Sequence, residues 1–223
     1  MHTLSQPAIF FDMDGVLIDS EPVWLESIEQ VFATLGIVLD DAMKTHTAGM
    51  GNVESVEWLL SLYPGVQADV LEICQQIDRT VLRRIECGIE SIPGADGLLR
   101  DLVRRGVPMA LVSTSGVELM AAVVRANQWD GCFRLVLSSE EIGPGKPDPA
   151  VYRAAVQRLQ ADPVRSLAIE DTINGARSAH GAGLRVIGLP MNAEVAAGMQ
   201  PFVWQIAGDY AAVRKWVESV FPA

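Results

Sequence analysis

Two aspartates, Asp12 and Asp14, stand two residues apart at the end of a short apolar run, and a glycine follows them. The run 8–11 is typical of a buried strand. Buried parallel strands expose polar groups at their ends, and open α/β sheets bind ligands at the carboxyl ends of their strands. Asp12 is therefore placed to react with a ligand, with Asp14 close enough to take part. Taken alone, the pair could equally be two solvated strand-end residues. An EF-hand loop is excluded, because the glycine here is the fourth residue and such a loop needs it sixth.

Three further polar clusters follow apolar stretches in the same way. They are Ser113 with Thr114 after the stretch 107–113, Lys146 shortly after 134–138, and Glu170 with Asp171 after 166–169. Each has a plain structural explanation: Ser113 as a helix cap, Lys146 as a solvated loop lysine and Asp171 as an N-cap. In a parallel sheet, however, all these strand ends lie at one edge, which favours a single shared site.

Four carboxylates at one sheet edge require positive charge nearby. Two carboxylates about 4 Å apart repel by roughly 4 kcal/mol at an effective dielectric constant near 20. Lys146, one of three lysines in the chain, supplies one positive charge. A hard divalent cation such as Mg²⁺ would supply two more through oxygen ligands. Ser113 and the backbone amides that open the following helix can hold phosphate oxygens.

The elements expected around these clusters alternate between strand and helix. Besides 8–11, strands are predicted at 107–113, 134–138, 166–169 and 184–189. Helices are predicted at 95–105, 115–127, 149–159 and 209–220, and a further helix follows the acidic pair and ends near residue 180. Ser115 and Glu118 have the spacing of a capping box, while Asp148 and Pro149 have the pattern of an N-cap and a first helical residue. Repeated strand-then-helix units predict right-handed crossovers and a Rossmann-like, doubly wound parallel sheet, an α/β fold.

The region 19–90 shows helical spacing throughout. Helices are predicted at 22–36, 53–62 and 69–85, with a polar, glycine-bearing loop at 45–51. The predicted organisation is therefore a catalytic core of residues 1–18 and 91–223, with a small all-helical domain of residues 19–90 inserted after the first strand.

The composition limits the partners. The 223 residues carry a formal net charge of −11, which disfavours nucleic acid and anionic membranes. The three cysteines, Cys74, Cys87 and Cys132, are widely spaced, which indicates reduced thiols. The chain shows neither a signal peptide pattern nor an apolar run of the roughly 18 to 20 residues that a membrane helix needs. We therefore expect a soluble, cytoplasmic, monomeric protein.

The order of these motifs resembles that of the haloacid dehalogenase-like hydrolase superfamily. The stretch 11–22 carries the resemblance most strongly, and the helical insert resembles the small cap domain of that superfamily. The nearest resemblance is to the bacterial sugar-phosphate phosphatases, such as those acting on 2-deoxyglucose 6-phosphate and hexitol phosphates, and to the β-phosphoglucomutase branch. It implies a Mg²⁺-dependent phosphomonoesterase acting on a small sugar or polyol phosphate.

The resemblance also implies a role for each motif. Asp12 would be the nucleophile that forms an aspartyl-phosphate, and Asp14 would be first general acid and then general base. The remaining implied roles are phosphate binding by Ser113, Thr114 and Lys146, and metal binding by Asp12, Asp14, Glu170 and Asp171.

Asp14 favours phosphoryl transfer, because the dehalogenases of this superfamily lack the second aspartate. Trp24 stands where the mutases usually carry a cap histidine, which favours a phosphatase over a sugar phosphomutase of the β-phosphoglucomutase type. A phospho-accepting signalling module is disfavoured, because its reactive aspartate follows an internal strand and it has no helical insert.

Trp24 could equally pack inside the helical domain, and His46 could be a solvated loop residue. The candidate substrate contacts are Glu21, Trp24, His46, Asn174 and the loop 47–51.

Overall fold

The computed structural model describes residues 6–47 and 50–222. The chain divides into two compact units. The sheet unit comprises Met1–Asp19 and Glu90–Ala223, and the helical unit comprises Ser20–Ile89.

The sheet unit is built on six parallel strands in the order β3-β2-β1-β4-β5-β6. The strands are β1 (Ile9–Phe11), β2 (Met109–Ser113), β3 (Leu135–Ser138), β4 (Leu167–Glu170), β5 (Arg185–Gly188) and β6 (Gln205–Ile206). Strand order reverses at β1, which pairs with β2 on one side and with β4 on the other. This confirms the predicted α/β fold, and it places the end of β1 at the topological switch point, where such sheets bind ligands.

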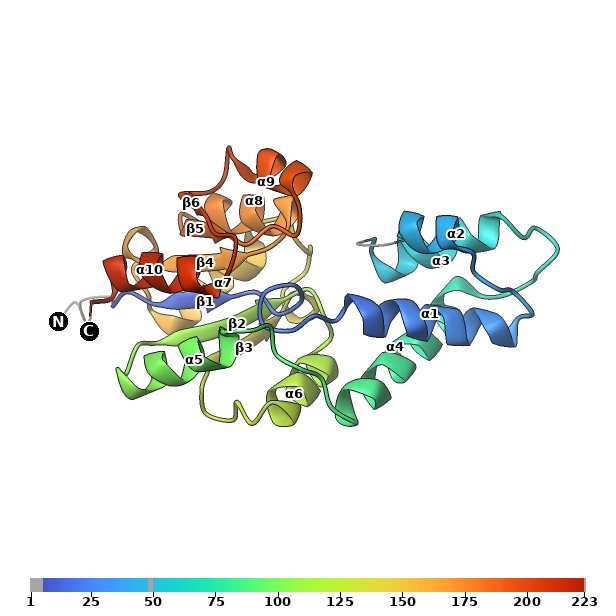
Figure 1. Cartoon of the computed structure of the whole chain (residues 1–223), viewed down its shortest axis with the longest axis horizontal. Coiled ribbons are helices and arrows are strands. Elements are labelled where there is room, and N and C mark those ends of the chain that lie inside the picture. Colours follow the sequence, from blue (N-terminus) through green and yellow to red (C-terminus); the bar gives the residue numbers. More distant parts are fainter. Residues whose placement is uncertain (1–5, 48–49, 223) are drawn as a thin grey trace. The chain divides into compact units, whose positions relative to one another are not determined.

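Side chains from both faces of the central strands are fully buried, which explains their uninterrupted apolar sequences. On one face, Phe10 and its neighbours pack against α7 (Ala150–Leu159) and α8 (Ile173–Gly181). Phe10 meets the ring of Tyr152 edge-on, with 6.5 Å between centroids. The remaining helices that flank the sheet (Figure 1) are α5 (Ala95–Arg104), α6 (Val117–Ala126), α9 (Ala193–Met199) and α10 (Tyr210–Val220).

Two predicted helix starts need correction. The helix α6 begins after Gly116, whose position makes no side-chain cap, so the capping box at Ser115 and Glu118 is wrong. The Ser115 hydroxyl bonds elsewhere, to Asp14. The carboxylate of Asp148 does accept the Ala150 backbone N–H at 2.8 Å, but the N-cap position is Pro149, so α7 starts one residue later than predicted. The short elements α9 and β6, and two 3₁₀ turns at Ser139–Glu141 and Pro163–Arg165, were not resolved by the sequence pattern.

The helical unit contains α1 (Glu21–Thr34), α2 (Asp41–Thr47), α3 (Asn52–Ser61) and α4 (Val70–Glu86), and no strand lies in its described residues. Helix α1 packs against α4, and both bury apolar side chains. Part of the predicted loop at 45–51 is wrong, because residues 45–47 end α2. Ala48 and Gly49 lie outside the described residues. In the described part of the chain, no helix is long and apolar enough to cross a membrane.

The loop that follows β1 is fastened to the C-terminal helix. Leu17 N–H donates to the Met13 carbonyl at 2.8 Å, and Gly15 N–H donates to the Ile18 carbonyl at 2.9 Å. The Val16 carbonyl accepts the hydroxyl of Tyr210, the first residue of α10, at 2.7 Å. Both residues are buried, so this bond helps to hold the loop that carries Asp14.

Replacing Tyr210 by Phe should destabilise the protein by about 1 to 3 kcal/mol near neutral pH, because a buried carbonyl loses its donor. Burial raises the pKa of Tyr210 above its ordinary value near 10. The unfolded chain therefore releases the tyrosine proton at a lower pH than the folded chain, and the stability that depends on the neutral hydroxyl falls as pH rises above about 10. Urea unfolding should show that wild type and Tyr210→Phe differ less in their free energy of unfolding above that pH. A difference in this free energy that stays constant with pH would contradict the hydrogen bond from Tyr210 to Val16.

Candidate active site

A buried lysine joins two carboxylates at the ends of adjacent strands. Phe11 and Ile169 are paired residues of β1 and β4, so the residues after them, Asp12 and Glu170, are neighbours at the sheet edge. Lys146 Nζ lies 2.5 Å from Asp12 Oδ1 and 2.7 Å from Glu170 Oε1. All three side chains are almost completely buried, with 7% of the Lys146 side chain exposed. Solvent therefore screens this ion-pair network weakly.

Asp171 adds a third carboxylate to this site. One oxygen each from Asp12, Glu170 and Asp171 lies within 4.8 Å of the others. Glu170 Oε2 and Asp171 Oδ1 are buried and have no hydrogen-bond partner in the described residues. When ionised, the three groups carry three negative charges against the single charge of Lys146. Unpartnered hard oxygens with excess negative charge fit a divalent cation such as Mg²⁺.

Burial and neighbouring charges shift the pKa values of Asp12, Asp171 and Lys146. Burial raises the pKa of Asp12 well above its ordinary value, although Lys146 opposes the shift. The pKa of Asp171 is raised to about 7 by burial and by the adjacent charge of Glu170. Burial alone would lower the pKa of Lys146, but Asp12 and Glu170 outweigh it and the pKa rises. The lysine therefore stays charged, whereas a further positive charge would stabilise the ionised forms of Asp12 and Asp171.

Asp14 lies outside this trio and bonds with serine hydroxyls. Ser115 Oγ donates to Asp14 Oδ2 at 2.7 Å, and Ser113 Oγ lies 3.5 Å from the same oxygen. The Ser115 N–H donates to Ser113 Oγ at 3.0 Å. The structure thus brings Ser113, which is buried, to Asp14, while Thr114 beside it is exposed. Ser115 was missed as a site residue because its spacing to Glu118 favoured a helix cap.

Two glycines allow the carboxylates to come this close, and neither was singled out as a site residue from the sequence. Gly15 has φ +72°, and a Cβ added there would lie 2.0 Å from Asp171 Oδ2. A Cβ added to Gly175, in the first turn of α8, would lie 1.8 Å from Glu170 Oε2. The two carboxylates therefore occupy the space that the Cβ atom of any other residue at these positions would need.

The predicted substrate contacts have more varied positions. Within the sheet unit, Asn174 is exposed on α8. Within the helical unit, Glu21 and Trp24 lie on α1, and His46 on α2 stacks on Trp58 with 3.9 Å between ring centroids. The stack shows that His46 has a packing partner within its own unit. The contacts of these four residues with a substrate stay predictions.

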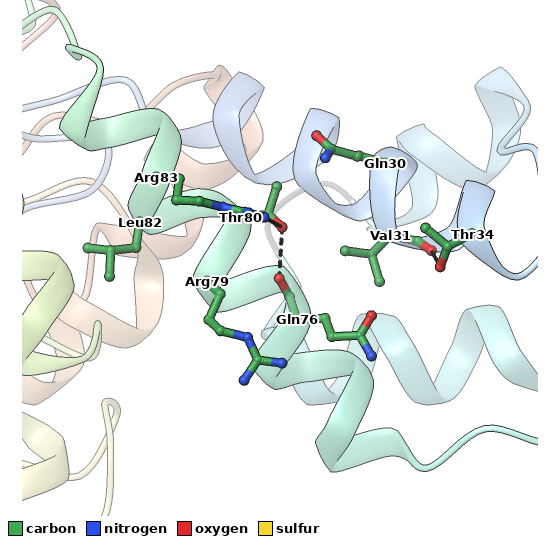
Figure 2. A pocket seen from close by; sticks show the side chains of 8 residues that line it. All are labelled: Gln30, Val31, Thr34, Gln76, Arg79, Thr80, Leu82 and Arg83. Carbon is green, nitrogen blue, oxygen red and sulfur yellow. Dashed lines mark hydrogen bonds between the residues drawn. The ribbon is translucent and has the colours of Figure 1, made fainter.

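The helical unit has a groove of about 360 Å³ between α1 and α4. Figure 2 shows the side chains that line it, from Gln30, Val31 and Thr34 on α1 and from five residues of α4. None of the predicted site residues lines this groove, and its titratable residues, Arg79 and Arg83, are exposed. It is therefore a surface groove that belongs to the helical unit alone.

A doubly wound parallel sheet with three carboxylates and a buried lysine near its switch point is an α/β fold whose site could hold a divalent metal ion. The sequence profile of the haloacid dehalogenase-like hydrolases matches residues 7–183 of the chain. The protein belongs to this family, which confirms the resemblance drawn from the motifs.

Individual relatives extend this finding. Over 184 residues the chain is 27% identical to hexitol phosphatase B of Escherichia coli (strain K12), a match that covers 82% of this chain and 83% of that protein. It is 29% identical over 183 residues to the bifunctional riboflavin kinase/FMN phosphatase of Arabidopsis thaliana, covering 82% of this chain but only 48% of the plant protein. Among solved structures, a mutant CbbY from Rhodobacter sphaeroides in complex with xylulose-(1,5)bisphosphate matches with TM-score 0.75 and 25% identity, covering 92% of this chain and 95% of that one.

Replacing Gly15 by Ala should displace the Asp171 carboxylate and weaken divalent-metal binding, because the new methyl group needs the space of Oδ2. The matched control is Gly36→Ala in the helical unit, where φ is +75° and no atom lies within 4 Å of the added Cβ. Both variants carry the left-handed backbone cost of about 1 to 2 kcal/mol, but only Gly15→Ala carries the clash. Mn²⁺ titration should show weaker binding in Gly15→Ala alone. Equal Mn²⁺ affinity in both variants would contradict the assignment of Asp171 to the metal site.

Proposed function

We propose that this protein is a Mg²⁺-dependent phosphomonoesterase that hydrolyses small sugar or polyol phosphates through an aspartyl-phosphate on Asp12. The observation that supports this most is the buried ion pair of Asp12 with Lys146 at 2.5 Å, at the switch point of the sheet. The lysine favours the ionised carboxylate in a place where burial opposes it, and an ionised carboxylate is needed for attack.

In the first step, one Asp12 oxygen attacks phosphorus, and the bond between phosphorus and the ester oxygen breaks. Lys146 holds Oδ1, which leaves Oδ2 as the attacking atom. Asp14, in its protonated form, donates its proton to the leaving alcohol oxygen. Ser115 and Ser113 orient the Asp14 carboxyl group for this transfer through their contacts to Oδ2.

In the second step, water attacks the phosphorus of the aspartyl-phosphate, and Asp14 accepts the proton of that water. The bond between phosphorus and Asp12 breaks, which releases inorganic phosphate and restores the carboxylate. Bound at Asp12, Glu170 and Asp171, Mg²⁺ would offset the negative charge of the carboxylates and the phosphoryl group together. Ser113, Thr114 and the first backbone N–H groups of α6, which has no side-chain cap, would hold phosphoryl oxygens.

The relatives support a substrate class, and we assign its selection to the helical unit. One relative is named a hexitol phosphatase, and a structural relative holds a pentulose bisphosphate, so a phosphorylated carbohydrate or polyol is the favoured class. We assign the helical unit the role of a cap that selects the substrate, through Glu21, Trp24, His46 and the residues after α2, and that excludes water. We still expect a cytoplasmic monomer that binds neither nucleic acid nor membranes.

A phosphate-release screen tests this function. Sugar phosphates and polyol phosphates should release inorganic phosphate over many turnovers with Mg²⁺, EDTA should abolish release, and added Mg²⁺ should restore it. Conversion of β-glucose 1-phosphate to glucose 6-phosphate faster than phosphate release would favour a mutase instead. A single stoichiometric phosphorylation without turnover would favour a phospho-accepting module. Activity that resists EDTA would contradict the metal site.

Replacing Asp12 by Asn should lower kcat by several orders of magnitude, because the amide cannot form the covalent intermediate. The variant should remain folded, since Lys146 keeps its ion pair with Glu170 and its bond to the Val112 carbonyl. Steady-state phosphate release measures the loss, and far-ultraviolet circular dichroism checks the fold. Substantial turnover by a folded Asp12→Asn protein would mean that another group attacks phosphorus.

A further inference from the structure

The buried carboxylate of Glu170 receives two donors on a single oxygen. Lys146 Nζ lies 2.7 Å from Oε1, and the hydroxyl of Tyr152 donates to the same atom at 2.5 Å. The other oxygen, Oε2, is buried and has no hydrogen-bond partner in the described residues. One oxygen of this carboxylate thus accepts both donors, and the other accepts none in the described residues.

Tyr152 is held in place on several sides. It lies on α7 and is fully buried, its ring meets Phe10 edge-on, and Lys146 Nζ lies 5.1 Å from the ring centroid. A buried ring packed in this way has little freedom to turn, so its hydroxyl has a fixed position. Because the bond joins helix α7 to the last residue of β4, it fixes the Glu170 carboxylate relative to the sheet.

We propose that Tyr152 is a positioning residue for the metal site. Its hydroxyl, together with Lys146, holds Glu170 Oε1 and thereby keeps Oε2 available to a divalent cation. The inference rests on the proposed function in that it takes Glu170 as a metal ligand. Hydrogen bonds from outside the ligand shell orient ligating carboxylates, and losing one typically weakens metal binding by about 10- to 100-fold.

A purely structural role for the hydroxyl makes a different prediction. In that case Tyr152 only satisfies a buried carboxylate, and removing the hydroxyl lowers the free energy of unfolding without changing metal affinity. The substitution Tyr152→Phe separates the two roles. It keeps the ring packing against Phe10, and Glu170 Oε1 keeps Lys146 as a donor, so the variant should fold.

The experiment compares Mn²⁺ binding by wild type, Tyr152→Phe and Tyr63→Phe, measured by the electron paramagnetic resonance signal of free Mn²⁺. Tyr63 is the matched control, because its hydroxyl donates to Met43 Sδ in the helical unit. Tyr152→Phe should bind Mn²⁺ at least about tenfold more weakly than wild type, and Tyr63→Phe should bind as wild type does. Equal Mn²⁺ affinity in all three proteins overturns the inference.

Two further readouts strengthen the test. The Mg²⁺ concentration for half-maximal phosphate release should rise in Tyr152→Phe, with little change in kcat at saturating Mg²⁺. In wild type, Mg²⁺ should change the ultraviolet absorption of tyrosine, because a cation on Glu170 draws charge from the bond to the Tyr152 hydroxyl. Tyrosine absorption that does not respond to Mg²⁺ contradicts the inference without needing a variant.

The outcomes also separate this inference from the proposed function. If wild type binds Mn²⁺ but releases no phosphate, the proposed function fails and the Mn²⁺ comparison still decides the role of Tyr152. If wild type releases phosphate and Tyr152→Phe binds Mn²⁺ equally well, only the role of Tyr152 fails. A wild-type protein that binds no Mn²⁺ overturns both the metal site and the positioning role.

Discussion

Negative charges gathered in a buried place need positive charge beside them, and this constraint organises the sheet unit. Asp12, Glu170 and Asp171 lie together at the ends of two adjacent strands. Lys146 contacts Asp12 and Glu170 from the loop that follows β3, a strand separated from β1 by β2. Removing one partner from a buried ion pair typically destabilises a protein by about 3 to 5 kcal/mol. The ion pairs of Lys146 therefore stabilise the position of the loop that carries it. The remaining negative charge is what a divalent cation would balance.

Parallel strand order makes this gathering possible. Because β1 lies between β2 and β4, residues that are more than a hundred positions apart in sequence reach the same edge. The end of β2 contributes Ser113 and then Ser115, which hold Asp14, while the end of β4 contributes the acidic pair. The loop after β1 is in turn held by Tyr210 from the last helix. The site thus depends on the whole sheet unit rather than on one local motif.

The sequence predicted those parts of the site that follow from position at a strand end. Asp12, Ser113 and Glu170 stand at the ends of apolar runs, and parallel pairing brings these ends together. Lys146 stands eight residues after the run 134–138 and reaches them from a loop. Ser115 and Tyr152 could not be found in this way, because their contacts depend on where a hydroxyl points after packing. Gly175 escaped notice because its importance lies in the absence of a side chain beside Glu170. Short elements such as α2 and β6 were missed because a few residues carry too little periodicity.

The geometry also explains why a lysine suits residue 146 better than an arginine. An ammonium group has three donors, and Nζ has three acceptors within reach: Asp12 Oδ1, Glu170 Oε1 and the Val112 carbonyl at 3.1 Å. A planar guanidinium would not converge on three acceptors at one point. Because all three donors are used within the protein, a phosphoryl oxygen can gain a bond from Lys146 only by sharing one of them. The bond to Val112 is the longest of the three and involves a neutral acceptor, so it is the one that yields at least cost. In the proposed reaction, Lys146 would then bind the phosphoryl group while it keeps its contacts with Asp12 and Glu170.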